Sequence, residues 1–325
     1  MTNILIALVV LLAIITLVQI TRVSELLGEL KNQDVNTVTE KDNKTQGVLF
    51  LFIGMGFLAF VVWQMLEWNH LLLPPASSMH GAKIDSLMQF TMGLILVVFF
   101  ILTPVLFYFS YKYSGRENNK AYYYPHNNKL ELIWTIVPTV ILTGVIIYGL
   151  KTWDEVMNVD TSDSKTIEVF SKQFQWLARE AGQDKTLGNA DFRLIDATNT
   201  LGVDLEDINS YDDKIVREVH LVVNEPVLLK FRSQDVIHSA FLPHFRVQMN
   251  CVPGLSTQFA FTPTQTTQEM KLQEGEDFEY VLLCNKICGS AHYNMQMKFI
   301  VETQEEYDSW YATQKTLKEK LLTQK

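Results

Sequence analysis

Residues 278–295 read FEYVLLCNKICGSAHYNM, and this stretch says most about the fold of the chain. Its first six residues form an apolar and aromatic run that predicts a β-strand. The loop that follows carries four groups that bind soft metal ions: the thiols of Cys284 and Cys288, the imidazole of His292 and the thioether of Met295. A tight loop directly after a strand would aim these groups at one point. We therefore expect a metal site built between strand ends, at one pole of a β-sandwich.

Short β-type runs precede and follow this stretch, and Asn, Asp, Gly and Pro separate them. Together they predict an all-β sandwich or barrel over residues 154–302, with a polar insertion at 178–215. Residues 303–325 have apolar side chains spaced among charges, which predicts one C-terminal amphipathic helix. The other predicted strands are Thr166–Phe170, Val216–Val223, Val227–Arg232, Thr257–Phe261 and Met297–Glu302.

The N-terminal part of the chain, residues 1–153, has a different pattern. Four apolar runs approach the roughly 20 residues that a membrane-spanning helix needs. We expect transmembrane helices at 4–20, 47–66, 90–111 and 132–150. The first run could also be a signal peptide, but no Lys or Arg precedes it and no small-residue cleavage site follows, so we expect a retained helix. The fold class predicted is multi-domain: transmembrane α-helices followed by an all-β domain.

Basic residues in the loops set the orientation of these helices. The loop between the second and third runs carries only Lys83. The other two loops carry four basic residues each: Arg22, Lys31, Lys41 and Lys44 in the first, and Lys112, Arg116, Lys120 and Lys129 in the last. The positive-inside rule places both basic loops in the cytoplasm. The domain after Trp153 is then exported.

Charge is divided unequally along the chain. Residues 1–150 contain 9 Lys and Arg and 9 Asp and Glu, so the net charge of −9 lies in the C-terminal part. This acidic balance argues against nucleic acid as a partner, because no basic phosphate-binding stripe can form. It suits a basic protein partner attracted by long-range steering, and it is equally consistent with a role in solubility alone.

The metal at the predicted site follows from the ligand types. Thiolate and thioether sulfur with imidazole favour copper, and His238, just past another strand, is the natural second imidazole. A closed zinc site could use the two cysteines and two histidines, but it would give Met295 no role. A mononuclear blue-copper site needs only one cysteine. Because two thiolates in one loop can each bridge two metals, the extra cysteine points to a dinuclear centre.

At these residues the chain resembles cytochrome c oxidase subunit II, the subunit of haem–copper oxidases that carries the CuA centre. The resemblance covers most of the chain from about Gly81 onward. The loop together with His238 is its most specific part. The other markers are Leu130-Glu131-x-x-Trp134-Thr135-x-x-Pro138, Asp235-Val236-Ile237-His238-Ser239 and Val252-Pro253-Gly254. The resemblance implies a cupredoxin-like sandwich. The chain has two N-terminal helices more than the family's usual two, so we expect a multi-pass protein of a bacterial plasma membrane, with the copper domain on the periplasmic side.

The resemblance also implies a role for each ligand residue of a centre with two copper ions. These roles are bridging thiolates from Cys284 and Cys288, terminal imidazoles from His238 and His292, a weak thioether from Met295 and a weak backbone carbonyl from Lys286. Electrons would come from a cytochrome c-type donor and pass to haem in subunit I, where oxygen is reduced and protons are pumped. The implied partners are oxidase subunit I, other oxidase subunits, membrane lipid and the donor, which could be soluble, tethered or in a supercomplex.

Glu131 matches a family carboxylate at the cytoplasmic entrance of a proton channel. A carboxylate in the first turn of a helix is also favoured by the helix dipole alone, and both interpretations stay open. Phe174 and Trp176 fall in the aromatic segment through which electrons enter family members. Phe174 stands where the family typically has Trp, so the docking surface or the donor differs from the mitochondrial case.

Two further departures concern charge near the site. The family usually has Glu at the position of Lys286, and that side chain helps bind magnesium at the subunit I interface. An ammonium group cannot ligate Mg²⁺, so the resemblance leaves a magnesium site in doubt here. Gln248 and Asn250 replace a Lys and an Asp that are usual in the family. We expect Cys251 and His244 to be structural, and His220 to lie on a strand surface.

Three other functions compete with the oxidase hypothesis. A membrane-tethered copper carrier would need an exposed, exchangeable site, whereas ligands fixed at strand ends indicate a closed one. A quinol-oxidase subunit with a metal-free domain would lack the two cysteines of the loop. A nitrous oxide reductase would need a propeller-length region and would have no use for four membrane spans. The chain contains no Cys-x-x-Cys-His, so no c-type haem is expected on it.

Overall fold

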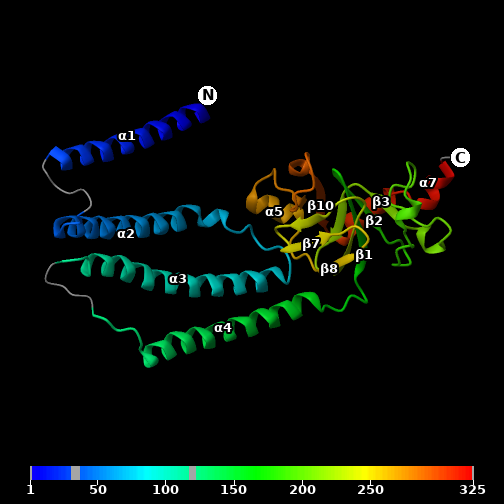
Figure 1. Ribbon diagram of the computed structural model, residues 1–325. Coiled ribbons are helices and arrows are strands. Elements are labelled where there is room, and N and C mark those ends of the chain that lie inside the picture. The colour runs from blue at the N-terminus through cyan, green and yellow to red at the C-terminus, as the bar shows by residue number, and fades with distance from the viewer. Residues whose placement is uncertain (1, 31–36, 117–121, 324–325) are drawn as a thin grey trace. The chain divides into compact units, whose positions relative to one another are not determined.

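The computed structural model describes residues 2–30, 37–116 and 122–323 (Figure 1). Lys31 and Lys120, which contribute to the two basic loops, lie outside the described residues. The chain divides into two compact units, and each is considered by itself. One unit comprises residues 1–69 with 95–128, and the other comprises residues 70–94 with 129–325.

Four long helices coincide with the four predicted apolar runs and extend beyond them. They are α1 (Thr2–Leu30), α2 (Glu40–Trp68), α3 (Gly81–Lys112) and α4 (Asn128–Met157). Each has the length and composition to cross a membrane. Most of their apolar side chains are exposed, while contacts between α2 and α3, such as that of Phe99 with Phe57, partly cover others. A helix that is apolar on every side needs a lipid or protein environment, because it has no polar face to turn toward water.

The soluble part of the chain is a sandwich of two five-stranded sheets. The first sheet has the order β3-β2-β1-β5-β8, and the second has the order β4-β10-β9-β6-β7. The strands of the first sheet are β1 (Lys165–Lys172), β2 (Gln175–Glu180), β3 (Lys214–Val216), β5 (Val227–Ser233) and β8 (Thr257–Phe261). Those of the second are β4 (Val219–Val222), β6 (His238–Leu242), β7 (Val247–Cys251), β9 (Tyr280–Cys284) and β10 (Gln296–Glu302).

Most neighbouring strands are antiparallel, whereas β1 with β5 and β10 with β4 run parallel. Inward-facing side chains from both sheets form one continuous core. On β10 the burial alternates strictly, with Met297, Phe299 and Val301 facing inward. Period-2 alternation is what a strand with one buried face requires. The core includes the sulfur-bearing residues of the predicted metal site, so the site is an extension of the core at one end.

Several expected boundaries differ from those observed. The run Val216–Val223 is interrupted after Val216, and its two parts join different sheets as β3 and β4. Strand β2 continues to Glu180 and β3 begins at Lys214, so the segment between sheet strands is shorter than 178–215. The expected C-terminal helix is two helices, α6 (Gln304–Thr313) and α7 (Leu317–Thr323), because the chain turns away from the helix at Gln314. Helix α5 (Thr267–Glu274) was not expected from the sequence.

The expectation that His220 lies on a strand surface is wrong. His220 is buried on β4, and its ring stacks on Trp310 of α6 with centroids 3.8 Å apart. Its Nδ1 lies 2.7 Å from a carboxylate oxygen of Glu302. Helix α6 covers the outer face of β4, which a strand pattern read alone treats as exposed to solvent.

A buried ion-pair network ties the long β2–β3 connection to the first sheet. The Arg179 side chain is only 2% exposed, and its guanidinium donates to Glu168 at 2.9 Å and to Asp213 at 3.0 Å. It also donates to the carbonyl of Gly188 at 2.9 Å, within the connection itself. Arg232 pairs with the other oxygen of Glu168. Removing the central cation would therefore leave Asp213 buried without a charged partner, and Glu168 with Arg232 alone.

We expect Arg179→Met to lower the free energy of unfolding of the sandwich by about 3–5 kcal/mol, because it strands buried charge. Thermal unfolding of the purified full-length chain, followed by circular dichroism of the sheets, measures this. Arg193→Met is the matched control, since the Arg193 side chain is 74% exposed and pairs weakly with Asp191. Its effect should stay below about 0.5 kcal/mol. Equal effects of the two substitutions would contradict the role assigned to the network.

Candidate metal centre

Strand pairing brings the first two predicted ligands together. His238 is the first residue of β6, and Cys284 is the last residue of β9. These strands are antiparallel neighbours, with Ala240 opposite Cys284. A residue that begins one strand and a residue that ends its antiparallel neighbour lie at the same edge of a sheet. The ligands therefore meet although they are 46 residues apart in sequence.

The loop after β9 adds the remaining groups. Cys284 Sγ and Cys288 Sγ are 3.8 Å apart, well beyond the roughly 2.05 Å of a disulfide bond, and both cysteines are free. His238 Nδ1 lies 3.8 Å from Cys284 Sγ, and the Lys286 carbonyl oxygen lies 3.3 Å from the same sulfur. His292 Nδ1 lies 3.6 Å from Cys288 Sγ, and Met295 Sδ lies 3.9 Å from it.

These separations fit ligands arranged around metal ions. Two ligand atoms that each lie about 2.0–2.3 Å from one metal, at a tetrahedral angle, are roughly 3.5–3.8 Å apart. The ligand atoms of His238, Cys284 and Cys288 all lie within 4.8 Å of one another. His292 and Met295 instead approach Cys288 alone. The short contacts thus place His238 and the Lys286 carbonyl beside Cys284, and His292 and Met295 beside Cys288, with the two sulfurs in contact between them.

Burial makes the Cys288 thiol a poor acid before metal binds. Loss of solvent raises the pKa of Cys288 to about 11, and the neighbouring Cys284 thiol acts in the same direction. At neutral pH this thiol therefore keeps its proton in the metal-free chain. Because a metal binds the thiolate, binding must release that proton, and affinity will rise with pH.

Asp235 orients the His238 imidazole. Its Oδ1 lies 2.9 Å from His238 Nε2, which leaves Nδ1 directed at the sulfurs. Burial alone would raise the pKa of Asp235, but hydrogen bonds from His238 and from the backbone N–H groups of Gln173 and Val236 hold it below its ordinary value. A carboxylate on the distal nitrogen of a ligating histidine fixes the tautomer of that histidine. Sequence reasoning gave Asp235 no role, although its place three residues before His238 was a usable signal.

The two predicted aromatic residues lie beside the centre but differ in exposure. Trp176 is 4% exposed, and its ring edge faces His238 with centroids 6.1 Å apart. Its Nε1 donates to the Met295 carbonyl at 3.4 Å. Phe174 is partly exposed and packs over Gly289 of the ligand loop. Of the two, only Phe174 reaches the surface, while Trp176 supports the ligands from within.

Of the remaining residues considered in the sequence, Cys251 lies beside the centre, and His244 and Glu131 lie away from the ligand atoms. Cys251 is fully buried opposite His238 on β7, and burial raises the pKa of its thiol to about 12. His244 follows the far end of β6, where its ring packs edge-on against Phe278 at 5.0 Å. Glu131 stands in the first turn of α4, and about 40 Å of helix separates it from the sandwich.

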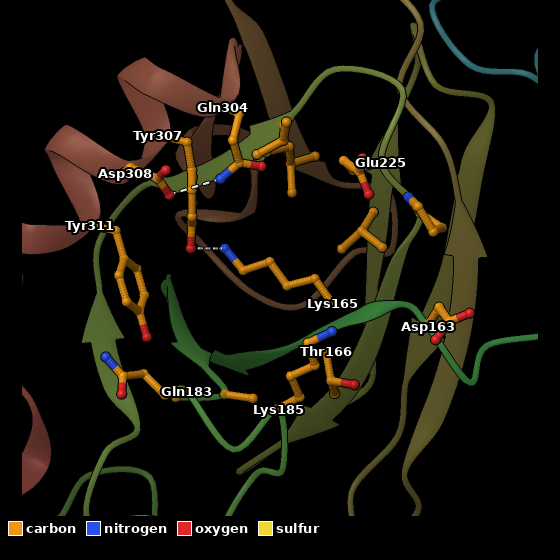
Figure 2. Close-up of a pocket in the computed structure, with 16 residues that line it drawn as sticks. Asp163, Lys165, Thr166, Gln183, Lys185, Glu225, Gln304, Tyr307, Asp308 and Tyr311 are labelled. Carbon is orange, nitrogen blue, oxygen red and sulfur yellow. Dashed lines mark hydrogen bonds between the residues drawn. The ribbon is translucent and has the colours of Figure 1, made fainter.

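A cavity of about 390 Å³ lies at the other ends of β1 and β2 (Figure 2). Its most buried cation, Lys165, already has partners. The Lys165 amine, directed at the Tyr307 hydroxyl in Figure 2, pairs with the buried Glu180 carboxylate at 2.7 Å. Tyr307 in turn donates to Glu180 at 3.0 Å. Burial lowers the pKa of Lys165 despite this pairing. The cavity lies between α6 and the sheet, and none of the proposed metal ligands lines it.

Helices long and apolar enough to cross a membrane, joined to a β-sandwich whose pole gathers His, Cys and Met, define a protein with a candidate membrane anchor and a candidate metal site. Family models specify it further. The transmembrane domain of cytochrome c oxidase subunit II matches residues 50–152, and the periplasmic domain of the same subunit matches residues 166–303. The chain belongs to the cytochrome c oxidase subunit II family, and hence to an oxidoreductase of the haem–copper type.

Individual relatives agree with this assignment. The alternative cytochrome c oxidase subunit 2 of Bradyrhizobium diazoefficiens is 30% identical over 274 residues, which cover 83% of this chain and 91% of the relative. Cytochrome c oxidase subunit 2 of Synechocystis is 25% identical over 284 residues, covering 82% of each chain. The crystal structure of the periplasmic domain of a Bradyrhizobium japonicum subunit II matches with a TM-score of 0.31 and 22% identity, over 47% of this chain and 94% of that one.

The two family models confirm the resemblance, and together with the observed helices and sandwich they confirm the fold class predicted from the sequence. They also confirm that a transmembrane part is followed by a periplasmic domain. The family implies a copper centre, and the His238–Cys284–Cys288 group is the place in the described residues where three such ligands converge.

We expect Asp235→Asn to weaken copper binding by roughly 10- to 100-fold, because an amide holds the His238 tautomer less firmly than a carboxylate. Competition between the purified chain and a copper chelator measures the affinity. Asp163→Asn, an exposed carboxylate at the other end of the sandwich, is the control and should bind copper as the unaltered chain does. Unchanged affinity in Asp235→Asn would mean that packing alone orients His238.

Proposed function

We propose that this chain is the subunit of a cytochrome c oxidase that accepts electrons from a cytochrome c-type donor at a dinuclear CuA centre and delivers them to haem in subunit I. There oxygen is reduced to water and protons are pumped. The observation that carries the proposal is the pair of free thiols 3.8 Å apart, each with its own further ligands. One electron shared between two metal ions changes the charge on each by half a unit, so bond lengths change little.

The proposed ligands are His238, Cys284, Cys288, His292, Met295 and the carbonyl of Lys286. The two thiols are buried, and so are His238 and Met295, so the chain excludes water from most of the centre. A site saturated by protein ligands leaves no open position for substrate. The same closure disfavours a copper carrier, since a carrier must release its metal to a partner.

The surface over the centre supports a docked partner. Ile287 and Tyr293 of the ligand loop are 85% and 87% exposed, so an aliphatic and an aromatic side chain stand at the surface beside the centre. Phe174 lies beside the loop at Gly289 and would be the point where electrons enter. The acidic balance of residues 151–325 would attract a basic donor.

We also propose the division of labour along the chain. Residues 1–153 would anchor it in a bacterial plasma membrane, residues 154–302 would hold the copper centre on the periplasmic side, and residues 303–325 would pack as helices on that domain. Glu131 would serve at a proton-channel entrance, and its place in the first turn of α4 supports this as well as the dipole role. A magnesium site that used the side chain at position 286 would be lost, because Lys286 carries an ammonium group.

Cys288→Ser should abolish oxidase turnover with a cytochrome donor while haem incorporation into subunit I largely survives, because only the copper centre loses its second bridging thiolate. Copper per complex, haem spectra and oxygen consumption of the purified oxidase measure this together. Cys251→Ser is the matched control, a buried cysteine with no proposed ligand role, and should keep copper and turnover. Retained copper stoichiometry and normal turnover in Cys288→Ser would contradict the assignment of Cys288 as a bridging ligand of a CuA centre.

Lys286→Ala should leave the copper centre formed, with two coppers per chain and an unchanged visible spectrum. The reason is that the backbone carbonyl of residue 286, which lies 3.3 Å from Cys284 Sγ, survives any side chain. Cys284→Ser, two residues away, is the control that should lose the spectrum. Loss of the copper absorption in Lys286→Ala would show that the ammonium group takes part in holding the loop.

A further inference from the structure

The turn between β1 and β2 carries no proposed ligand, yet it contacts both loops that do. The ligands lie on strands and loops of the second sheet, whereas this turn belongs to the first sheet. Gln173 stands in the turn and makes hydrogen bonds in two directions. Any role of this residue in holding the ligands in place rests on the proposed copper centre.

The side chain of Gln173 holds the loop after β9. Its Nε2 donates to the carbonyl oxygen of Cys288 at 2.5 Å. That carbonyl belongs to the residue whose thiol contacts Cys284, His292 and Met295. Fixing the peptide of Cys288 restricts the directions in which its Cα–Cβ bond, and hence its sulfur, can point.

The backbone of Gln173 holds the loop before β6. Its N–H donates to Asp235 Oδ2 at 2.7 Å, while Asp235 Oδ1 lies 2.9 Å from His238 Nε2. One residue thus links the peptide of a bridging cysteine to the carboxylate that orients a terminal histidine. Neither ligand loop can shift relative to the other without breaking one of these bonds.

The next residue adds a steric restraint to the same loop. Phe174 lies where a side chain on Gly289 would stand, since a Cβ there would come within 2.7 Å of the ring. Gly289 also has a φ of +141°, which few other residues adopt. The Gln173 amide therefore contacts the ligand loop at Cys288, and the Phe174 ring contacts it at the next residue, Gly289.

We propose that the side chain of Gln173 is a positioning group for the copper centre and acts through the Cys288 peptide, while the backbone N–H of the same residue holds Asp235. It touches no metal and passes no electron. Its contribution is to fix the position of the loop after β9 relative to the loop before β6. Groups that orient metal ligands in this way usually change metal affinity by roughly 10- to 100-fold when they are removed.

Gln173→Met tests this, because methionine keeps the length of the side chain and removes the amide donor. The full-length chain is assembled in its oxidase complex, and copper per chain, the rate of copper loss to a chelator and the electron paramagnetic resonance spectrum are measured. We expect two coppers per chain, roughly tenfold faster copper loss and altered hyperfine couplings. The matched control is Gln175→Met, an exposed glutamine of the adjoining strand whose side chain makes no hydrogen bond within the described residues.

The outcomes separate this inference from the function on which it rests. An unaltered chain without two coppers and a shared-electron spectrum overturns the proposed centre, and with it this role. A normal spectrum in the unaltered chain, with a Gln173→Met variant identical in rate and spectrum, overturns the positioning role alone. A variant that lowers only the temperature of unfolding, or a Gln175→Met control with equal effects, likewise shows that Gln173 merely stabilises the fold.

Discussion

The antiparallel pairing of β6 with β9 is the constraint on which the proposed function depends. It sets Ala240 opposite Cys284 and so brings the start of one strand, His238, to the end of the other. Because side chains alternate between faces, a slip of one residue in this register would turn Cys284 toward the opposite face. The buried residues of both strands prevent such a slip, since it would expose core side chains such as Leu282. The hydrophobic core therefore specifies the geometry of the ligands.

The same burial disfavours charged forms of the ligand side chains while no metal is bound. A buried thiol holds its proton and a buried imidazole needs an acceptor, so the centre without metal is electrostatically costly to ionise. The chain resolves this with nearby groups. Asp235 fixes His238, Trp176 caps the Met295 carbonyl, and the turn of the first sheet fixes Cys288. Each support comes from an element that is distant in sequence from the ligand loop, so that loop depends on the closed sandwich for its shape.

Much of this could be predicted from the sequence, for identifiable physical reasons. Long apolar runs have few alternatives to membrane helices, and four ligand types in one loop constrain the chemistry strongly. The strands β6 and β7 were not predicted, because they are short and mix polar with apolar residues, as in His238-Ser239 and Asn250-Cys251. His220 was misjudged because its cover, Trp310, lies 90 residues later. Contacts such as Gln173 with Cys288 leave no local pattern, because the tertiary fold alone creates them.

The difference between Phe174 and Trp176 follows from the same logic. Both are aromatic, two residues apart in the same hairpin, and the sequence gives no reason to separate their roles. The structure does, because Trp176 is the second residue of β2 and faces the core, while Phe174 lies in the turn before that strand. A ring inside the core can stiffen the ligands but cannot meet a partner. A ring in the turn, packed on Gly289 and partly exposed, can do both. Under the proposed function, the aromatic ring that a donor would meet is therefore determined by where the strand begins.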